Sequence, residues 1–366
     1  MNPNPSTPEL LRGDGYVLLP AFAEPHAHLD KAFLAERVDN PTGDLLGAIM
    51  AMERARPSIT LADTIERAER AARLLAANGC TAIRTHVDLT LIGKLTSVAA
   101  LIEVRERLRG LVDIQVAALC AWPSIGDEGA DQRALLREAI DMGIDVIGGC
   151  PHLETDPAAA NDNFLTMASE AGLPVDLHTD ETLDPAMLAL EDLAERVVAT
   201  GFPHHVAASH CVTLAVQSEH RQREVAEKVA AAAISVIALP HTNLFLQGRE
   251  FQVSMPRAVT AVKALRAAGV NVAAGADNLQ DPFNPVGRGD PLETAGLMVM
   301  TAHVSPSDAL EMVSSAARAA MGLGPCEDRV AVRACTIREA IAFGPADRLV
   351  VRHGSDLETE RSHVRG

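Results

Sequence analysis

The chain has 366 residues, of which 48% are hydrophobic and only 3% aromatic, and its formal net charge is −17. Nucleic acids and anionic membrane surfaces both require a basic face on the protein, so this charge argues against either as a partner. No apolar run in the sequence reaches the roughly 18 residues of a membrane-spanning helix. The length suits one large barrel domain with a small appendage.

The first fifteen residues are polar and rich in proline, and they lack the apolar segment of a signal peptide. Six cysteines are scattered along the chain and form no C-x-x-C pair. This usage is typical of reduced, mostly buried thiols. We therefore expect a cytoplasmic protein.

Eight strand-like apolar runs alternate with helical patterns, at one strand-plus-helix unit per roughly thirty residues after a longer first gap. The runs are 16–23, 81–86, 114–119, 146–149, 174–177, 205–209, 235–239 and 271–274. The helical patterns are 44–56, 61–77, 96–108, 131–142, 161–171, 184–200, 214–233 and 256–268. Glycine often follows the helical pattern, which is typical of a helix C-cap. Strands that are apolar throughout are covered on both faces, so the fold class predicted is α/β, a (β/α)8 TIM-like barrel.

Two further helical stretches, 291–303 and 306–320, follow the eighth run, and one more strand is predicted at 348–351. We expect the barrel to comprise residues 21–339. Residues 1–20 and 340–366 are expected to form a reduced β appendage, with 14–19 and 348–351 as its strands.

Five polar residues stand at the ends of strand-like runs: His26, His28, His178, His210 and Asp277. Catalytic side chains of such barrels project from the C-terminal ends of the strands, so these five should converge on one mouth. The first two are two residues apart and point to the same side of an extended strand. Imidazoles together with a carboxylate suit a divalent metal such as zinc or iron(II).

The same residues lie in longer strings, which are EPHAHLDK, RTHVD, DIQVAA, GGCPHLE, DLHTDE, ASH, NLFLQGRE and GADNLQDPF-P, between residue 24 and residue 286. In these strings the chain resembles the amidohydrolase superfamily, and within it the cytosine-deaminase-like branch. It is also similar to N-isopropylammelide amidohydrolase. The resemblance implies a single divalent metal, zinc or iron(II) and also manganese, held by His26, His28, His178 and Asp277.

The resemblance also implies catalytic roles. Glu181 would shuttle a proton to the ring nitrogen, His210 would orient the water or stabilise the developing charge, and Asp277 would accept the proton of the water. Relatives with two metals carry a lysine on the fourth strand, whereas this chain has Gly-Gly-Cys at 148–150. We therefore expect one metal, whose bound hydroxide attacks a C–N bond of a small nitrogen heterocycle.

Two positions depart from the cytosine deaminase pattern. Ala121 stands where those enzymes have a glutamine that reads the pyrimidine, and Asn278 replaces a second aspartate. An amide both donates and accepts hydrogen bonds, whereas a carboxylate only accepts, so the ring recognised is expected to be other than, or additional to, cytosine. The candidate substrate-binding residues are Trp122, His152, Gln247, Asn278 and Phe283.

Three alternatives remain beside a deaminase. They are a ring-opening hydrolase of cyclic amides, an aminohydrolase that releases alkylamines from triazine rings, and a catalytically silent barrel used as a binding protein. We expect His86 to line the pocket or to stand behind the residues that do, and Asp30 and Lys31 to form an ion pair at its rim. The short β appendage leaves an open sheet edge, so a homo-oligomer is expected.

Overall fold

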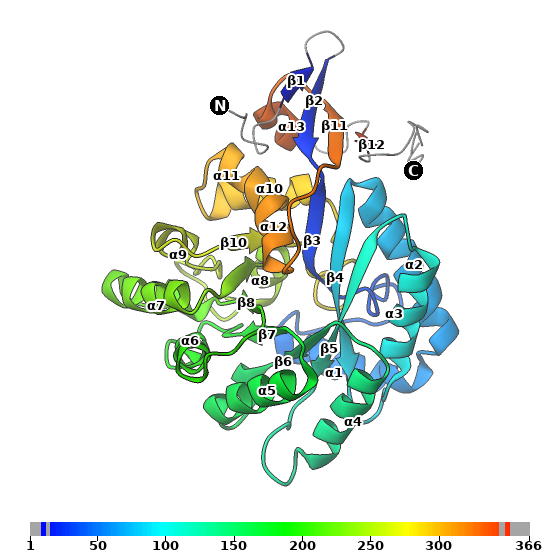
Figure 1. Cartoon of the computed structure of the whole chain (residues 1–366), viewed down its shortest axis with the longest axis vertical. Coiled ribbons are helices and arrows are strands. Elements are labelled where there is room, and N and C mark those ends of the chain that lie inside the picture. The colour runs from blue at the N-terminus through cyan, green and yellow to red at the C-terminus, as the bar shows by residue number, and fades with distance from the viewer. Residues whose placement is uncertain (1–8, 12–14, 344–347, 352–366) are drawn as a thin grey trace.

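The computed structural model describes residues 9–11, 15–343 and 348–351. Eight parallel strands follow one another around a barrel in chain order, from β3 to β10 (Figure 1). They are β3 (Phe22–Ala27), β4 (Cys80–Leu89), β5 (Asp113–Cys120), β6 (Val146–Gly149), β7 (Val175–Thr179), β8 (Val206–His210), β9 (Ser235–Ala238) and β10 (Val272–Ala274). The predicted (β/α)8 barrel is confirmed.

Helices cover the outside of the barrel, because each presents an apolar stripe to the strands. They are α2 (Leu61–Ala77), α3 (Thr96–Arg107), α4 (Ala130–Asp141), α5 (Pro157–Ala171), α6 (Ala189–Thr200), α7 (Glu219–Ala231), α9 (Val262–Ala267) and α10 (Pro291–Thr301). Two other helices, α1 (Leu45–Ala55) and α8 (Pro240–Leu246), line a cavity at the C-terminal end of the strands. Gly172 and Gly201 end α5 and α6 in the left-handed conformation, as the sequence predicted. Within the described ranges, no helix is both long and apolar enough to cross a membrane.

The barrel closes between its first and last strands at the C-terminal end. Asp277 donates its backbone N–H to the His26 carbonyl at 3.0 Å, and its own carbonyl accepts from the His28 N–H at 3.1 Å. Lower down, the buried carboxyl group of Glu24 accepts hydrogen bonds from the backbone N–H groups of His26 and Ala276. This closure brings residues 26–28 and 276–277, far apart in the sequence, side by side.

Small residues fill the opposite end of the barrel. Ala23, Ala82, Ala207 and Ala273 pack there with Ile237 in a separate apolar cluster. The helices α11 (Pro306–Met312) and α12 (Ser315–Ala320) follow α10, and α12 supplies residues to the same cluster. One end of the barrel is therefore packed shut, which leaves the C-terminal end of the strands for a site.

A four-stranded antiparallel sheet lies at one end of the molecule, beside both ends of the chain (Figure 1). Its order is β1 (Glu9–Leu11), β2 (Tyr16–Pro20), β11 (Arg329–Arg333) and β12 (Arg348–Val351), and α13 (Ile337–Phe343) precedes the last strand. The predicted β appendage from the chain ends is confirmed. Those parts of the expected appendage at 1–8, 12–14, 344–347 and 352–366 lie outside the described residues.

Several predicted bounds were wrong. The first apolar run is two strands, β2 in the small sheet and β3 in the barrel, so the barrel begins six residues later than the run. The strand β11 was not predicted, and it lies between the two appendage strands that were. The helices expected at 214–233 and 256–268 are shorter, and three short 3-10 helices occur at η1 (Arg56–Ser58), η2 (Pro151–Leu153) and η3 (Thr213–Val216).

Candidate active site

Four of the predicted ligands meet at the C-terminal end of the barrel. His26 lies near the end of β3 and His28 directly follows the strand, His178 lies in β7, and Asp277 follows β10. The His178 Nε2 atom is 3.2 Å from the Nε2 atoms of both His26 and His28, and the latter is 3.3 Å from Asp277 Oδ1. None of the four residues is more than 5% exposed. The sequence-predicted quartet is therefore one buried cluster.

Strained backbone positions two of the polar groups in this cluster. Asp277 has φ of 64° and His210 has φ of 70°, in the left-handed region that residues other than glycine seldom adopt. The two hydrogen bonds between Asp277 and the His26–His28 segment hold the first of these turns. Such strain persists where surrounding contacts enforce it, and it concentrates at functional sites.

The hydrogen bonds of the imidazoles test whether a cation fits the cluster. His26 donates from Nδ1 to Ser209 Oγ at 2.9 Å, and His28 donates from Nδ1 to the His86 carbonyl at 3.0 Å. Their Nε2 lone pairs therefore point into the cluster. Both carboxylate oxygens of Asp277 are buried without a hydrogen-bond partner among the described residues. Lone pairs and a carboxylate converging on one point fit a divalent cation.

Burial keeps two of the imidazoles, those of His26 and His178, neutral. It lowers the pKa values of both well below their ordinary range, and the neighbouring imidazoles lower them further. A neutral imidazole is the form that ligates a metal.

A buried network lies behind His26. The Ser209 hydroxyl donates a hydrogen bond to Asp176 Oδ1 at 2.8 Å, and Asp176 Oδ2 accepts one from the Arg84 guanidinium at 2.7 Å. His86, stacked on His26 at 4.0 Å between ring centroids, is 3.4 Å from the same carboxylate oxygen. Burial alone would raise the pKa of Asp176, but His86 and Arg84 hold it far below its usual range. An ionised Asp176 thus fixes the Ser209 hydroxyl as the acceptor of the His26 proton.

Glu181, the predicted proton carrier, and His210, predicted to orient the water or stabilise the developing charge, stand beside Asp277. His210 donates from Nδ1 to Asn243 Oδ1 at 2.9 Å, with Glu181 Oε1 at 3.5 Å from the same nitrogen. Its Nε2 atom is 4.0 Å from Asp277 Oδ2. Burial raises the pKa of Glu181 well above its ordinary value, and the Asp277 charge adds to this. Glu181 is therefore able to hold a proton near neutral pH.

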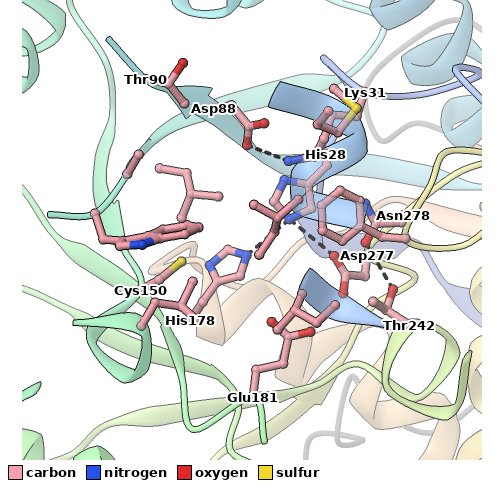
Figure 2. Close-up of a pocket in the computed structure, with 18 of the residues that line it drawn as sticks. His28, Lys31, Asp88, Thr90, Cys150, His178, Glu181, Thr242, Asp277 and Asn278 are labelled. Atoms are coloured by element: carbon pink, nitrogen blue, oxygen red, sulfur yellow. Dashed lines mark hydrogen bonds and ion pairs between the residues drawn. The ribbon is translucent and has the colours of Figure 1, made fainter. Parts of the chain in front are cut away.

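A cavity of about 690 Å³ opens above the cluster. His28, His178, Glu181, His210 and Asp277 line its floor, and Figure 2 shows Glu181 on the side opposite Lys31 and Asp88. Of the predicted substrate-binding residues, Trp122, Asn278 and Phe283 line this cavity. His152 and Gln247 instead line an adjoining chamber of about 1360 Å³, which shares Trp122 and Glu181 with the first.

Two of these side chains have protein partners. The Asn278 amide donates to Asp281 Oδ2 at 2.8 Å and accepts from the Thr242 hydroxyl at 3.1 Å (Figure 2). His152 donates from Nδ1 to the His178 carbonyl at 3.0 Å, and burial lowers its pKa to about 4.

Sequence reasoning missed a group of ions in the cavity wall. Lys31 Nζ lies 2.5 Å from Asp88 Oδ1, and Arg56 donates to Asp88 Oδ2 at 2.7 Å. The expected Asp30–Lys31 ion pair is wrong, because Asp30 Oδ2 instead accepts the backbone N–H of Asp88. The carboxylates of Asp88 and Asp30 outweigh burial and hold the pKa of Lys31 above its ordinary value. Side chains along a strand alternate between its two faces, so the sequence of β4 could have shown that Asp88, two residues after His86, lies on the same face as His86.

The chain matches the model of the amidohydrolase family over residues 33–325. It is 34% identical to the pterin deaminase of Rhizobium rhizogenes over 359 residues, which cover 94% of this chain and 81% of that protein. The crystal structure of 5-methylcytosine deaminase from Klebsiella pneumoniae, liganded with 5-fluorocytosine, superposes with a TM-score of 0.86 at 31% identity, covering 95% of this chain and 88% of that one. For N-isopropylammelide isopropylaminohydrolase from Burkholderia multivorans the TM-score is 0.75 at 30% identity, with 92% and 85% covered.

The chain therefore belongs to the amidohydrolase family. Within that class it is a hydrolase of carbon–nitrogen bonds other than peptide bonds, with deaminases among its relatives. The predicted family resemblance is confirmed.

Proposed function

We propose that this chain is a mononuclear, metal-dependent aminohydrolase that removes an amino group from a small nitrogen heterocycle other than, or in addition to, cytosine. The observation that carries the proposal is the buried convergence of three imidazoles on the unpartnered carboxylate of Asp277, with Glu181 beside it on the cavity floor. Relatives that deaminate pterin and 5-methylcytosine support the reaction class.

His26, His28, His178 and Asp277 would hold the cation, zinc or iron(II), with manganese also acceptable to this ligand set. When bound, a divalent metal lowers the pKa of water and polarises the atom under attack. The Gly-Gly-Cys segment that ends β6 offers no lysine to bridge a second ion, which supports a single metal.

The protein's own groups would move the protons. Water attacks the ring carbon that bears the amine, and Asp277 Oδ2 takes a proton from that water. His210 Nε2, whose lone pair faces Asp277, orients the water by accepting its second hydrogen. Glu181 donates its proton to the ring nitrogen, and Asp277 delivers the proton taken from the water to the amine, which leaves as ammonia. The remaining hydroxyl proton returns to Glu181 as the carbon becomes a carbonyl, which restores both acids. The buried Glu181 carboxyl, with its raised pKa, suits this donor role.

Release of an alkylamine instead of ammonia is a second candidate. The likeness to N-isopropylammelide isopropylaminohydrolase at 30% identity favours it, because this chain shares the barrel and most of its length with that enzyme. Product analysis separates the reactions: deamination adds one mass unit to the ring, loss of an alkylamine removes the alkyl group, and ring-opening hydrolysis adds a whole water.

The test is a screen for ammonia release from pyrimidines, purines, triazines, pterins and creatinine-like rings, with zinc, iron(II) and manganese in turn. Glu181→Gln should keep the metal and lose about 10²–10⁴-fold in kcat. His178→Ala should lose metal and activity together. Glu138→Gln, an exposed change on α4, is the matched control and should behave as the original chain does. Full activity of Glu181→Gln would contradict the proton-carrier role.

We also infer a homo-oligomer in the cytoplasm. The outer strands of the small sheet, β1 and β12, each leave one edge open to pairing with another chain. All six cysteines are free thiols, which is typical of a reducing compartment. Light scattering at micromolar concentration tests the assembly, and a purely monomeric species would exclude it.

A further inference from the structure

The cavity above the ligand cluster opens into a larger chamber. The two share Leu45 and Ile49 of α1, Leu153, Trp122 and Glu181, and the outer chamber measures about 1360 Å³. A ring bound with its reacting carbon beside Glu181 therefore has room to carry a substituent past Trp122. The metal-binding role proposed for His26, His28, His178 and Asp277 (the ligand cluster) gives no reason for this second chamber.

A buried imidazole that lines the chamber has a nitrogen without a partner among the described residues. His152 is 8% exposed and donates its Nδ1 hydrogen to the His178 carbonyl, which can only accept. With the hydrogen on Nδ1, Nε2 is the ring atom left to accept. Nε2 has no hydrogen-bond partner in the described part of the chain. It is an unfilled acceptor.

A second unfilled acceptor comes from the residue that follows α8. The Gln247 amide nitrogen donates to Asn243 Oδ1 at 3.4 Å, which turns the amide oxygen away from that partner. This oxygen, Oε1, is buried and has no partner among the described residues. An unmet buried acceptor costs free energy unless something donates to it, so both atoms favour a donor in the chamber.

The charges around the chamber have one sign. The carboxylates of Asp44, Asp184 and Glu250 line it, and no lysine or arginine of the described residues does. The nearest base along the chain, Arg249, donates to the Phe245 carbonyl and lies against Gly43. A cavity of this composition attracts donors and cations, and it repels anions.

We propose that the outer chamber binds a substituent of the ring that donates hydrogen bonds, a hydroxyl or an amine, through His152 Nε2 and Gln247 Oε1. The substrate is then a heterocycle with a neutral or cationic polar side group, and rings with a carboxylate at that position are excluded. The apolar side chains of Trp122, Leu246 and Phe251 cover the carbon skeleton of the substituent. This inference rests on the proposed function, since it names the substrate class of the same site.

The experiment compares two sets of rings on the metal-loaded protein: pterin, 6-hydroxymethylpterin and 6-carboxypterin, and cytosine with its 5-hydroxymethyl and 5-carboxy derivatives. Within a set only the substituent changes. We expect the hydroxymethyl ring to have the highest kcat/KM and the carboxy ring the lowest in the set that the protein accepts. Preference for the carboxy ring, or equal values for all three, would overturn the proposal.

Gln247→Leu keeps the side-chain size and removes the acceptor. It should lower kcat/KM for the hydroxymethyl ring about 2- to 12-fold, the range of one neutral hydrogen bond, and change the value for the unsubstituted ring by a smaller factor. Gln252→Leu, an exposed change on the same loop, is the control and should leave both values unchanged. An equal loss on both rings would mean a structural role and would overturn the assignment.

Gln247→Lys tests the chamber in the opposite sense. A cation at this position should raise kcat/KM for the carboxy ring relative to the hydroxymethyl ring, and an unchanged ratio would contradict the proposal. Calorimetric binding of the same rings separates this inference from the proposed function. Tighter binding of the hydroxymethyl ring than of the carboxy ring, without ammonia release, would refute the deaminase and support the chamber's preference.

Discussion

Two buried aspartates of the barrel, Asp176 and Asp88, both face basic side chains, but they differ in what else they meet. Asp176 contacts Arg84, His86 and Ser209 behind the ligand cluster and does not line the cavity. Asp88 holds Lys31 in the cavity wall itself (Figure 2). Arg56 pairs with the other oxygen of the same carboxylate. The comparison teaches that an ion pair enclosed by protein sets the shape and protonation of a site, whereas one in a cavity wall also meets the bound molecule.

The same substitution at the two aspartates gives the largest expected effect. Asp176→Asn leaves Arg84 buried without its carboxylate and should cost about 3–5 kcal/mol of the unfolding free energy. Asp88→Asn should cost less than half of that, because Lys31 keeps Asp30 and Asp281 nearby and faces the cavity. Urea unfolding of both metal-free variants measures the difference. Equal losses would remove the distinction between the two pairs.

Glu24 is a third buried carboxyl group, and unlike Asp176 and Asp88 it has no ion pair among the described residues. Burial raises its pKa to about 8, although the Ala276 and His26 N–H groups oppose this. The unfolded chain releases this proton near pH 4.5, so stability due to the protonated Glu24 falls as the pH rises toward 8. Glu24→Gln should therefore gain stability relative to the original chain between pH 5 and 8, on the order of 3 kcal/mol. Unfolding curves of both proteins at pH 5 and pH 8 measure this gain. If the difference in unfolding free energy between Glu24→Gln and the original chain is the same at both pH values, the raised pKa is refuted.

Ser209 connects the enclosed pair to the ligand cluster. Ser209→Ala removes the acceptor of the His26 Nδ1 hydrogen and should weaken metal binding about 10- to 100-fold. Ser235→Ala is the control, because its hydroxyl contacts His205, which is not a predicted ligand. Competition with a chelator measures both affinities. If the two variants bind metal alike, Asp176 does not act on the site through Ser209.

An exposed pair should show the smallest effect. Arg37 donates to Asp63 at 2.5 Å, but its side chain is 51% exposed. Arg37→Gln should change the unfolding free energy by less than about 1 kcal/mol, and in about 1 M salt the difference should vanish. A loss as large as that of Asp176→Asn would show that burial is not what separates these ion pairs.

Local pattern determined the barrel and the positions of the predicted ligands. Each strand is an apolar run, and each predicted ligand stands at the end of one, so chain order and strand period place His26, His28, His178 and Asp277 at one mouth. Glu181 lies three residues after His178, close enough along the chain to be carried to the same place.

Only the tertiary structure decided the groups that act across the barrel. Asp88 meets Lys31 and Arg56, which are 57 and 32 residues earlier in the chain, and Ser209 meets Asp176 on the neighbouring strand. The same holds for β11, which pairs with a strand more than three hundred residues earlier. Such partners share no period or motif in the sequence. Their choice depends on which strands become neighbours when the barrel closes and on which buried polar atoms then still require a partner.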